Sequence, residues 1–198
     1  MKGMPGSRRG TDAPADGRER PVRAVFLVGF MGAGKTSVGR VLARHLGWRF
    51  EDLDDRIQAR EGQTVPEIFQ KSGEAGFREA EREALVELLR QRKNGSPLVA
   101  ALGGGAYVQE EIAALLADSG ATTVFLDASP NELWQRCSSD VLPRPLRRGE
   151  SEFRQLYEVR RPRYLQAHIR VETGGKAVTD IVREIVSLLK LEIPGEEK

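Results

Sequence analysis

The 198-residue sequence is poor in the residues that build disulfides and imidazole-based sites. Its one cysteine, Cys137, excludes an internal disulfide and suits a protein of the reducing cytoplasm. We expect Cys137 to be a small residue within a helix rather than a reactive thiol. The two histidines, His45 and His168, belong to no cluster of candidate ligands, so we expect them to be surface or packing residues.

Long apolar runs and an excess of one charge are also missing. No apolar run approaches the roughly 20 residues that span a membrane. The 31 Lys and Arg residues nearly balance 29 Asp and Glu residues, which does not favour nucleic-acid binding. We therefore expect a cytoplasmic protein without nucleic-acid or membrane partners. Residues 1–22 have few large apolar side chains and lack the apolar stretch of a secretory signal, so we expect a disordered tail.

The feature that organises the chain is a glycine loop between an apolar run and a helical pattern. Ala24–Val28 are all apolar, as expected of a strand buried on both faces. The octet GFMGAGKT at 29–36 then matches the pattern G-x-x-x-x-G-K-[ST] at every position. Apolar residues recur at helical spacing after it. These flanks favour a phosphate-binding loop over a chance glycine turn.

The residue types of this loop suit a bound triphosphate. Glycines allow the main chain to bring its N–H groups close to a phosphate, and the following helix directs its positive end at the anion. Lys35 should reach the β- and γ-phosphates, and the Thr36 hydroxyl should hold Mg²⁺. The sequence therefore predicts that ATP contacts Gly32, Ala33, Gly34, Lys35, Thr36 and Ser37.

The remainder of the chain alternates between strand and helix patterns. Strands are expected at 48–52, 98–102, 122–127 and 169–172, with helices between them, and this alternation predicts an α/β fold. One short helix should begin after Thr64 as its N-cap, with Pro66 in its first turn, and end at Ser72-Gly73, before a second helix over 74–92. We expect a three-layer P-loop kinase fold with a central five-stranded parallel sheet flanked by helices. The domain should span 23–190, and 191–198 should be a frayed end.

Residues 138–150 follow neither a strand nor a helix period. They include two prolines and Arg144, Arg147 and Arg148. A loop of this length in a compact domain favours a mobile lid, whose arginines could supply charge to the transition state on closing. A plain solvated basic loop is the alternative interpretation.

Further candidate residues follow the expected strands. Asp52 and Asp54 come at the end of the second strand and share one side if the extended backbone continues that far. The alternative is an acidic turn that caps a helix starting near Arg56. Arg78 lies near the start of a helix expected over 74–92, where a cation opposes the helix dipole. Three glycines at 103–105 directly follow a strand, which indicates a close approach to another group.

Taken together, the motifs resemble those of the shikimate kinase family. They are GFMGAGKT at 29–36, the D-x-D of Asp52 and Asp54, GFREAE at 76–81, GGG at 103–105, RPL at 144–146 and R-x-P-x-Y at 160–164. The resemblance covers about residues 23–189. It implies ATP-dependent phosphorylation of the 3-hydroxyl of shikimate, a step of chorismate and aromatic amino-acid biosynthesis. A monomer is the expectation from the family.

The resemblance also implies roles for individual residues. The substrate would be bound by Asp54, Arg78, Gly103, Gly104, Gly105 and Arg160, with the two arginines on its carboxylate. The catalytic residues would be Lys35, Asp54 and Arg144. Thr36 and Asp52 would hold Mg²⁺, Asp52 through water. Further ATP contacts would come from Arg136, Arg144 and Lys176.

Two alternatives remain open at this point. A related small-metabolite kinase, either gluconate kinase-like or a nucleoside monophosphate kinase, shares the loop but is disfavoured by the glycine triplet together with GFREAE. A catalytically silent nucleotide-binding module is disfavoured because no residue that the chemistry needs has been replaced.

Overall fold

A computed structural model describes residues 22–92, 95–139 and 149–192. Most of the expected N-terminal tail, the centre of the expected lid with Arg144, and the last six residues lie outside the described residues. Among the described residues, no helix combines the length and the apolar character that crossing a membrane requires.

The centre of the fold is a five-stranded sheet, as the sequence predicts. All its neighbouring strands are parallel, and the order across the sheet is β2-β3-β1-β4-β5. The strands are β1 (Ala24–Val28), β2 (Arg49–Asp52), β3 (Leu98–Ala101), β4 (Thr122–Asp127) and β5 (Ile169–Glu172).

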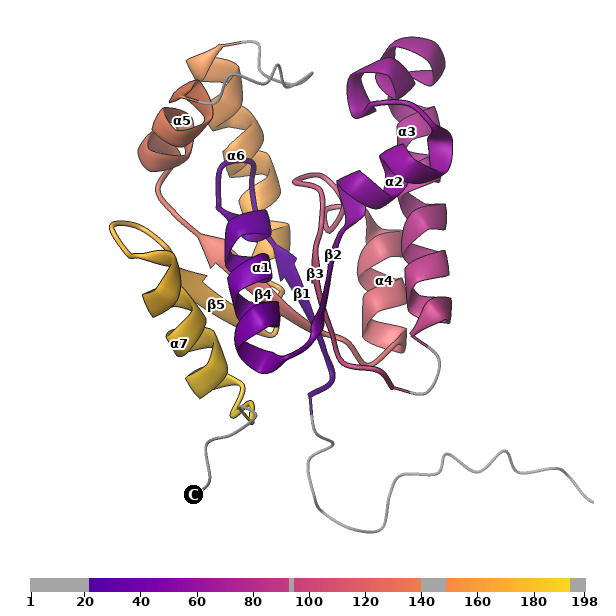
Figure 1. Ribbon diagram of the computed structural model, residues 1–198. Coiled ribbons are helices and arrows are strands. Elements are labelled where there is room, and N and C mark those ends of the chain that lie inside the picture. The colour runs from indigo at the N-terminus through magenta and orange to yellow at the C-terminus, as the bar shows by residue number, and fades with distance from the viewer. Residues whose placement is uncertain (1–21, 93–94, 140–148, 193–198) are drawn as a thin grey trace, which may run out of the picture.

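Helices cover both faces of this sheet, which completes the expected three layers. In Figure 1, α1 and α7 lie on the face towards the viewer and α6 passes behind the strands. The helices are α1 (Lys35–Leu46), α2 (Leu53–Glu61), α3 (Val65–Gln91), α4 (Glu110–Asp118), α5 (Pro130–Ser139), α6 (Glu150–Tyr164) and α7 (Val178–Leu188). The expected lid therefore shares its two ends with α5 and α6.

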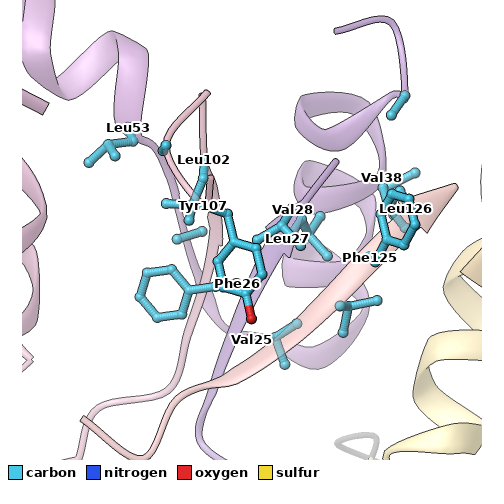
Figure 2. Close-up of a cluster of buried hydrophobic side chains, with 14 of the residues drawn as sticks. Val25, Phe26, Leu27, Val28, Val38, Leu53, Leu102, Tyr107, Phe125 and Leu126 are labelled. Carbon is cyan, nitrogen blue, oxygen red and sulfur yellow. The ribbon is translucent and has the colours of Figure 1, made fainter. Parts of the chain in front are cut away.

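The central strand β1 is buried throughout, as its apolar run predicts. Its five residues are at most 1% exposed, and Figure 2 shows Val25 to Val28 packed among side chains of neighbouring elements. β1 pairs with β3 on one side and with β4 on the other. The chain passes from β1 to β2, which lies beyond β3, and later from β3 to β4 on the opposite side of β1. Open α/β sheets bind ligands at such a point, beyond the carboxyl ends of the strands.

The junction between β2 and α2 differs from the sequence expectation. The extended backbone does not continue to Asp54, because α2 begins at Leu53. The alternative interpretation is right that an acidic residue caps a helix here, but it places the helix start near Arg56, three residues too late. The cause is a cap: Asp52 Oδ1 accepts a hydrogen bond from the main-chain N–H of Asp54 at 3.1 Å. The negative charges of Asp54 and Asp55 in the first turn also stabilise the helix, because its N-terminal end is positive.

The expected helix start at Thr64 is confirmed. Thr64 and Glu67 form a capping box, with Pro66 in the first turn. Instead of two separate helices, α3 runs on to Gln91, but Gly73 interrupts it with φ 68° and ψ −173°. The break occurs where the sequence predicts a helix end. In Figure 1, α2 and the first turns of α3 extend past the sheet on one side, opposite α5.

The rare residues of the sequence have packing or surface positions, as expected. Cys137 is buried in α5. His45 is exposed on α1. Nδ1 of His168 lies 3.1 Å from the Thr123 main-chain nitrogen and 2.8 Å from the Thr123 hydroxyl, which ties the start of β5 to β4.

The kink at Gly73 generates a test of backbone strain. A Cβ at Gly73 or at Gly62 meets nothing within 4 Å, but Gly62 has the common left-handed conformation (φ 63°, ψ 21°). The conformation of Gly73 is almost exclusive to glycine. We expect Gly73→Ala to lower the free energy of unfolding by about 2–3 kcal/mol and Gly62→Ala by about 1 kcal/mol. Urea denaturation measures both, and equal losses would contradict the strain assigned to Gly73.

Candidate active site

A cavity of about 620 Å³ lies at the carboxyl ends of the strands. It extends from the glycine loop, past the start of α2, to α3, the loop after β3, and α6. The predicted site residues that line it are Gly32, Gly34, Lys35, Thr36, Ser37, Asp52, Asp54, Arg78, Gly103, Gly104, Gly105, Arg136 and Arg160. Residues distant in sequence thus surround one space.

The glycine loop has the conformation of an anion cradle. Gly34 caps α1 in the left-handed conformation (φ 85°, ψ 17°), and Gly32 also has a positive φ of 80°. A Cβ at Gly32 would lie 2.8 Å from Sγ of the buried Cys137, so α5 packs directly against the loop. The ammonium group of Lys35 donates to the main-chain oxygens of Gly29 and Phe30, both at 2.9 Å, and so lies across the loop.

Beside this loop, a hydroxyl and a carboxylate meet. Thr36 Oγ1 donates to Asp52 Oδ2 at 2.7 Å. Hard oxygen donors of this kind suit Mg²⁺, which proteins bind through one or two carboxylates while phosphates and waters complete the shell. Within the described ranges there is no group of three His, Cys, Asp or Glu residues that could enclose a metal ion. These two oxygen donors would leave the other coordination positions of a metal ion to other ligands.

At the other end of the cavity, two carboxylates flank Gly103. A Cβ at Gly103 would lie 2.8 Å from Asp54 Oδ1 and 2.8 Å from Glu81 Oε1. In the described part of the chain, both oxygens are buried without a hydrogen-bond partner. Burial raises the pKa of Asp54 from 3.8 to about 6, and the charges of Asp52 and Glu81 act in the same direction, against Lys35. Two buried acceptors thus face the space that a side chain at position 103 would fill.

Two guanidinium groups approach the same end from different helices. Arg78 of α3 donates to Glu81 Oε2 at 2.7 Å, and a Cβ at Gly105 would lie 2.6 Å from its Nη2. Arg160 of α6 is 8% exposed and donates to Gly104 O at 3.4 Å. The glycine triplet therefore leaves room for two cations, which can bind one small anion between them.

Of the remaining predicted ATP contacts, Arg136 lines the cavity, whereas Ala33 and Lys176 do not. Arg136 Nη2 donates to Thr173 O at 3.1 Å, and its Nη1 lies 3.5 Å from Gly32 O, at the nucleotide side of the cavity. Ala33 of the glycine loop is buried and does not line the described cavity. Lys176 does not line the cavity; it is exposed and pairs with Glu184 at 2.6 Å.

Sequence reasoning assigned no role to Glu81, which is fully buried. A signal was available, because Glu81 falls within the apolar stripe of α3, four residues after Phe77 and four before Leu85. A charged residue on a buried helix face indicates a specific partner. The other missed lining residues are Met31, Gln58, Val65, Pro66, Phe69, Phe77 and Leu102, which ordinary packing patterns do not distinguish.

Known proteins with this arrangement identify the family. The family model described as shikimate kinase matches residues 31–190. The chain belongs to the shikimate kinase family. The shikimate kinase of Burkholderia pseudomallei strain 1710b is 43% identical over 175 residues, which are 86% of this chain and 91% of that protein. The Persephonella marina shikimate kinase is 37% identical over 169 residues, 85% of this chain and 100% of its own.

Solved structures give the same result for this shikimate kinase family member. Acinetobacter baumannii shikimate kinase in complex with shikimate has a TM-score of 0.79 and 38% identity, covering 85% of this chain and 93% of that chain. A gluconokinase from Sinorhizobium meliloti has a TM-score of 0.59 at 20% identity, which shows a common fold alone. The resemblance seen in the sequence motifs and the expected P-loop kinase fold are both confirmed.

The buried Asp54 should reduce stability at neutral pH. Its folded pKa of about 6 exceeds the ordinary 3.8, so between these values the folded protein binds more protons and becomes less stable as pH rises. In metal-free and nucleotide-free protein, we expect Asp54→Asn to raise the free energy of unfolding at pH 8 by about 1–3 kcal/mol. The difference should shrink towards pH 4.

Asp55→Asn is the matched control, because Asp55 is exposed in the same helical turn. It should leave stability within about 0.5 kcal/mol of the wild type. Urea denaturation at pH 4, 6 and 8 in EDTA measures all three proteins. A less stable Asp54→Asn variant at pH 8 would contradict the assigned burial cost.

Proposed function

We propose that this protein transfers the γ-phosphoryl group of ATP to the 3-hydroxyl of shikimate, giving shikimate 3-phosphate and ADP. The product belongs to the route to chorismate and the aromatic amino acids. The observation that carries the proposal is the acceptor end of the cavity. There, the buried Glu81, the half-buried Asp54 and two guanidinium groups surround a glycine triplet, in a chain of the shikimate kinase family.

The chemistry of this end suits a small anionic polyol. Arg78 and Arg160 would bind the carboxylate of shikimate, since planar guanidinium groups pair with carboxylates through directed hydrogen bonds. The unpartnered oxygens of Asp54 and Glu81 would accept hydrogen bonds from hydroxyl groups. Because Gly103 has no side chain, the substrate can lie against the main chain.

Asp54 would orient the reacting hydroxyl. Its pKa of about 6 leaves it mainly ionised above neutral pH, so it can accept a hydrogen bond from that hydroxyl. It can also receive the proton as the new P–O bond forms. The loose transition state of phosphoryl transfer needs alignment more than a strong base, so both roles are compatible with this geometry.

The glycine loop would hold the donor. Its main-chain N–H groups and the start of α1 would bind the phosphates, and Lys35 would exchange its contacts with Gly29 and Phe30 for phosphate oxygens. Thr36 and Asp52 would hold Mg²⁺, which neutralises phosphate charge when bound. Arg136 and Lys176 would contact the nucleotide, and Arg144 the transferred group. We also propose that the protein is cytoplasmic, because it has a single cysteine, and that it is a monomer, as the resemblance to the family implies.

Turnover against a panel of acceptors tests the function. We expect ADP release from ATP and Mg²⁺ with shikimate, but not with gluconate or nucleoside monophosphates. Shikimate holds its carboxylate and hydroxyls at fixed positions on a ring, whereas gluconate is an open chain that would lose conformational freedom on binding, and a nucleoside monophosphate is much larger. A coupled assay measures ADP. Asp54→Asn serves as the inactive control, which should still bind ATP in a calorimetric titration. A wild-type protein without shikimate-dependent ADP release would refute the proposal.

Arg160 provides a test of substrate binding. We expect Arg160→Ala to raise the shikimate KM by about tenfold or more, because one of two carboxylate partners is lost, while the ATP KM stays within about twofold. Arg163→Ala is the matched control, since Arg163 lies on the same helix, does not line the described cavity and bonds to Gln166. Steady-state kinetics with each substrate varied separately measures both constants. An unchanged shikimate KM would contradict the assigned role.

A further inference from the structure

A buried carboxylate lies behind the acceptor arginine without lining the cavity. Asp127 is the last residue of β4, and its side chain is 5% exposed. Its Oδ1 accepts a hydrogen bond from the Tyr157 hydroxyl at 3.1 Å, and its Oδ2 accepts from Arg161 Nη2 and Arg170 Nε, each at 2.9 Å. A buried charge is costly to leave unpaired. Asp127 therefore holds α6 and β5 against the end of β4.

Two of these partners belong to α6, the helix that carries Arg160. Arg161 Nε also donates to the Tyr157 hydroxyl at 3.0 Å, so two residues one turn apart contact Asp127 together. The Tyr157 ring packs edge-on against Phe30 of the glycine loop, with ring centroids 5.6 Å apart. Successive helical residues differ in direction by about 100°. Fixing Arg161 therefore sets the direction in which Arg160 leaves the helix.

Contacts within the cavity hold Arg160 less firmly. Its bond to Gly104 O is 3.4 Å long, beyond the usual range for an N–H···O hydrogen bond. Its Cζ lies 5.9 Å from the centroid of the Phe30 ring, at the outer limit of a cation–π contact. Arg160 also interacts with the Tyr164 hydroxyl and with the charge of Glu81. Since Tyr164 belongs to α6 as well, the orientation of the Arg160 side chain depends on how α6 is anchored.

We propose that Asp127 is a positioning residue for the acceptor site: through Arg161 and Tyr157, it directs Arg160 towards the substrate without touching it. This inference rests on the proposed function, because it assigns Arg160 to the shikimate carboxylate. It predicts that the Asp127 side chain affects acceptor binding and leaves the nucleotide side unchanged.

The nucleotide side depends on the main chain of Asp127 instead. The Asp127 main-chain oxygen accepts hydrogen bonds from Thr173 N at 2.7 Å and Thr173 Oγ1 at 3.0 Å. Thr173 O in turn accepts from Arg136 Nη2 at 3.1 Å. A substitution of the Asp127 side chain keeps that oxygen. The two substrates should therefore respond differently to the same change.

Asp127→Asn tests this separation. Asparagine keeps the shape of the side chain and can accept from Tyr157, but it loses the charge that holds Arg161. We expect the shikimate KM to rise about tenfold while the ATP KM stays within about twofold, since small misplacements of a binding group have large effects. A purely structural role would lower the melting temperature and the active fraction without separating the two constants.

Two arginine variants form a matched pair, because both residues bond to the same carboxylate oxygen. Arg161→Gln removes the partner on α6, and Arg170→Gln removes the partner on β5, which has no residue lining the described cavity. We expect Arg161→Gln to raise the shikimate KM about fivefold to tenfold, and Arg170→Gln to leave it within about twofold. Equal effects of the two variants would overturn the proposal.

The remaining outcomes separate this inference from the proposed function. A wild-type protein that does not phosphorylate shikimate refutes both. An active wild type, with a shikimate KM unchanged in Asp127→Asn and Arg161→Gln, refutes only the role of Asp127. Parallel rises in both KM values also refute it. If thermal melting shows that Asp127→Asn does not fold, Arg161→Gln and Tyr157→Phe decide the question by the same criterion.

Discussion

The parallel pairing of β1 between β3 and β4 is the constraint on which the site depends. Parallel strands all end at one edge of the sheet, so the loops that follow them meet there. The glycine loop follows β1, Asp52 ends β2 and the glycine triplet follows β3. Buried β1 residues hold this register, because a shift of one residue would expose apolar side chains or bury polar ones.

Charge is distributed along the cavity according to what each end has to bind. The donor end presents main-chain N–H groups, Lys35 and the Thr36–Asp52 pair, which suit phosphate and a metal ion. The acceptor end combines arginines with the carboxylates of Asp54 and Glu81, and burial raises the pKa of both. A cavity of uniformly positive charge would bind anions in general. Buried acceptors that need hydroxyl donors add the discrimination that charge alone does not provide.

The acceptor end also requires support from outside the cavity. α6 carries Arg160, and the same helix is anchored by the contacts of Arg161 and Tyr157 with Asp127 and by the buried Tyr164. On the opposite side, Gly73 interrupts α3 before Arg78 and Glu81. Both sides of the acceptor site therefore depend on residues that do not contact the proposed substrate.

Local patterns in the sequence were sufficient for the elements, the glycine loop and the family. The octet at 29–36, the cap at Thr64 and the break at Gly73 depend on nearest neighbours along the chain, so they can be read without a fold. The helix start after Asp52 was misjudged, because a cap made by the strand's own last residue resembles a loop. The pairing of Asp54 with Glu81 across Gly103, and of Asp127 with Arg161, joins residues 27 or more positions apart. Such contacts follow from sheet order and helix packing, which the sequence does not specify locally. Only the folded chain therefore shows that oxygens of Asp54 and Glu81 lack hydrogen-bond partners and that those of Asp127 have them.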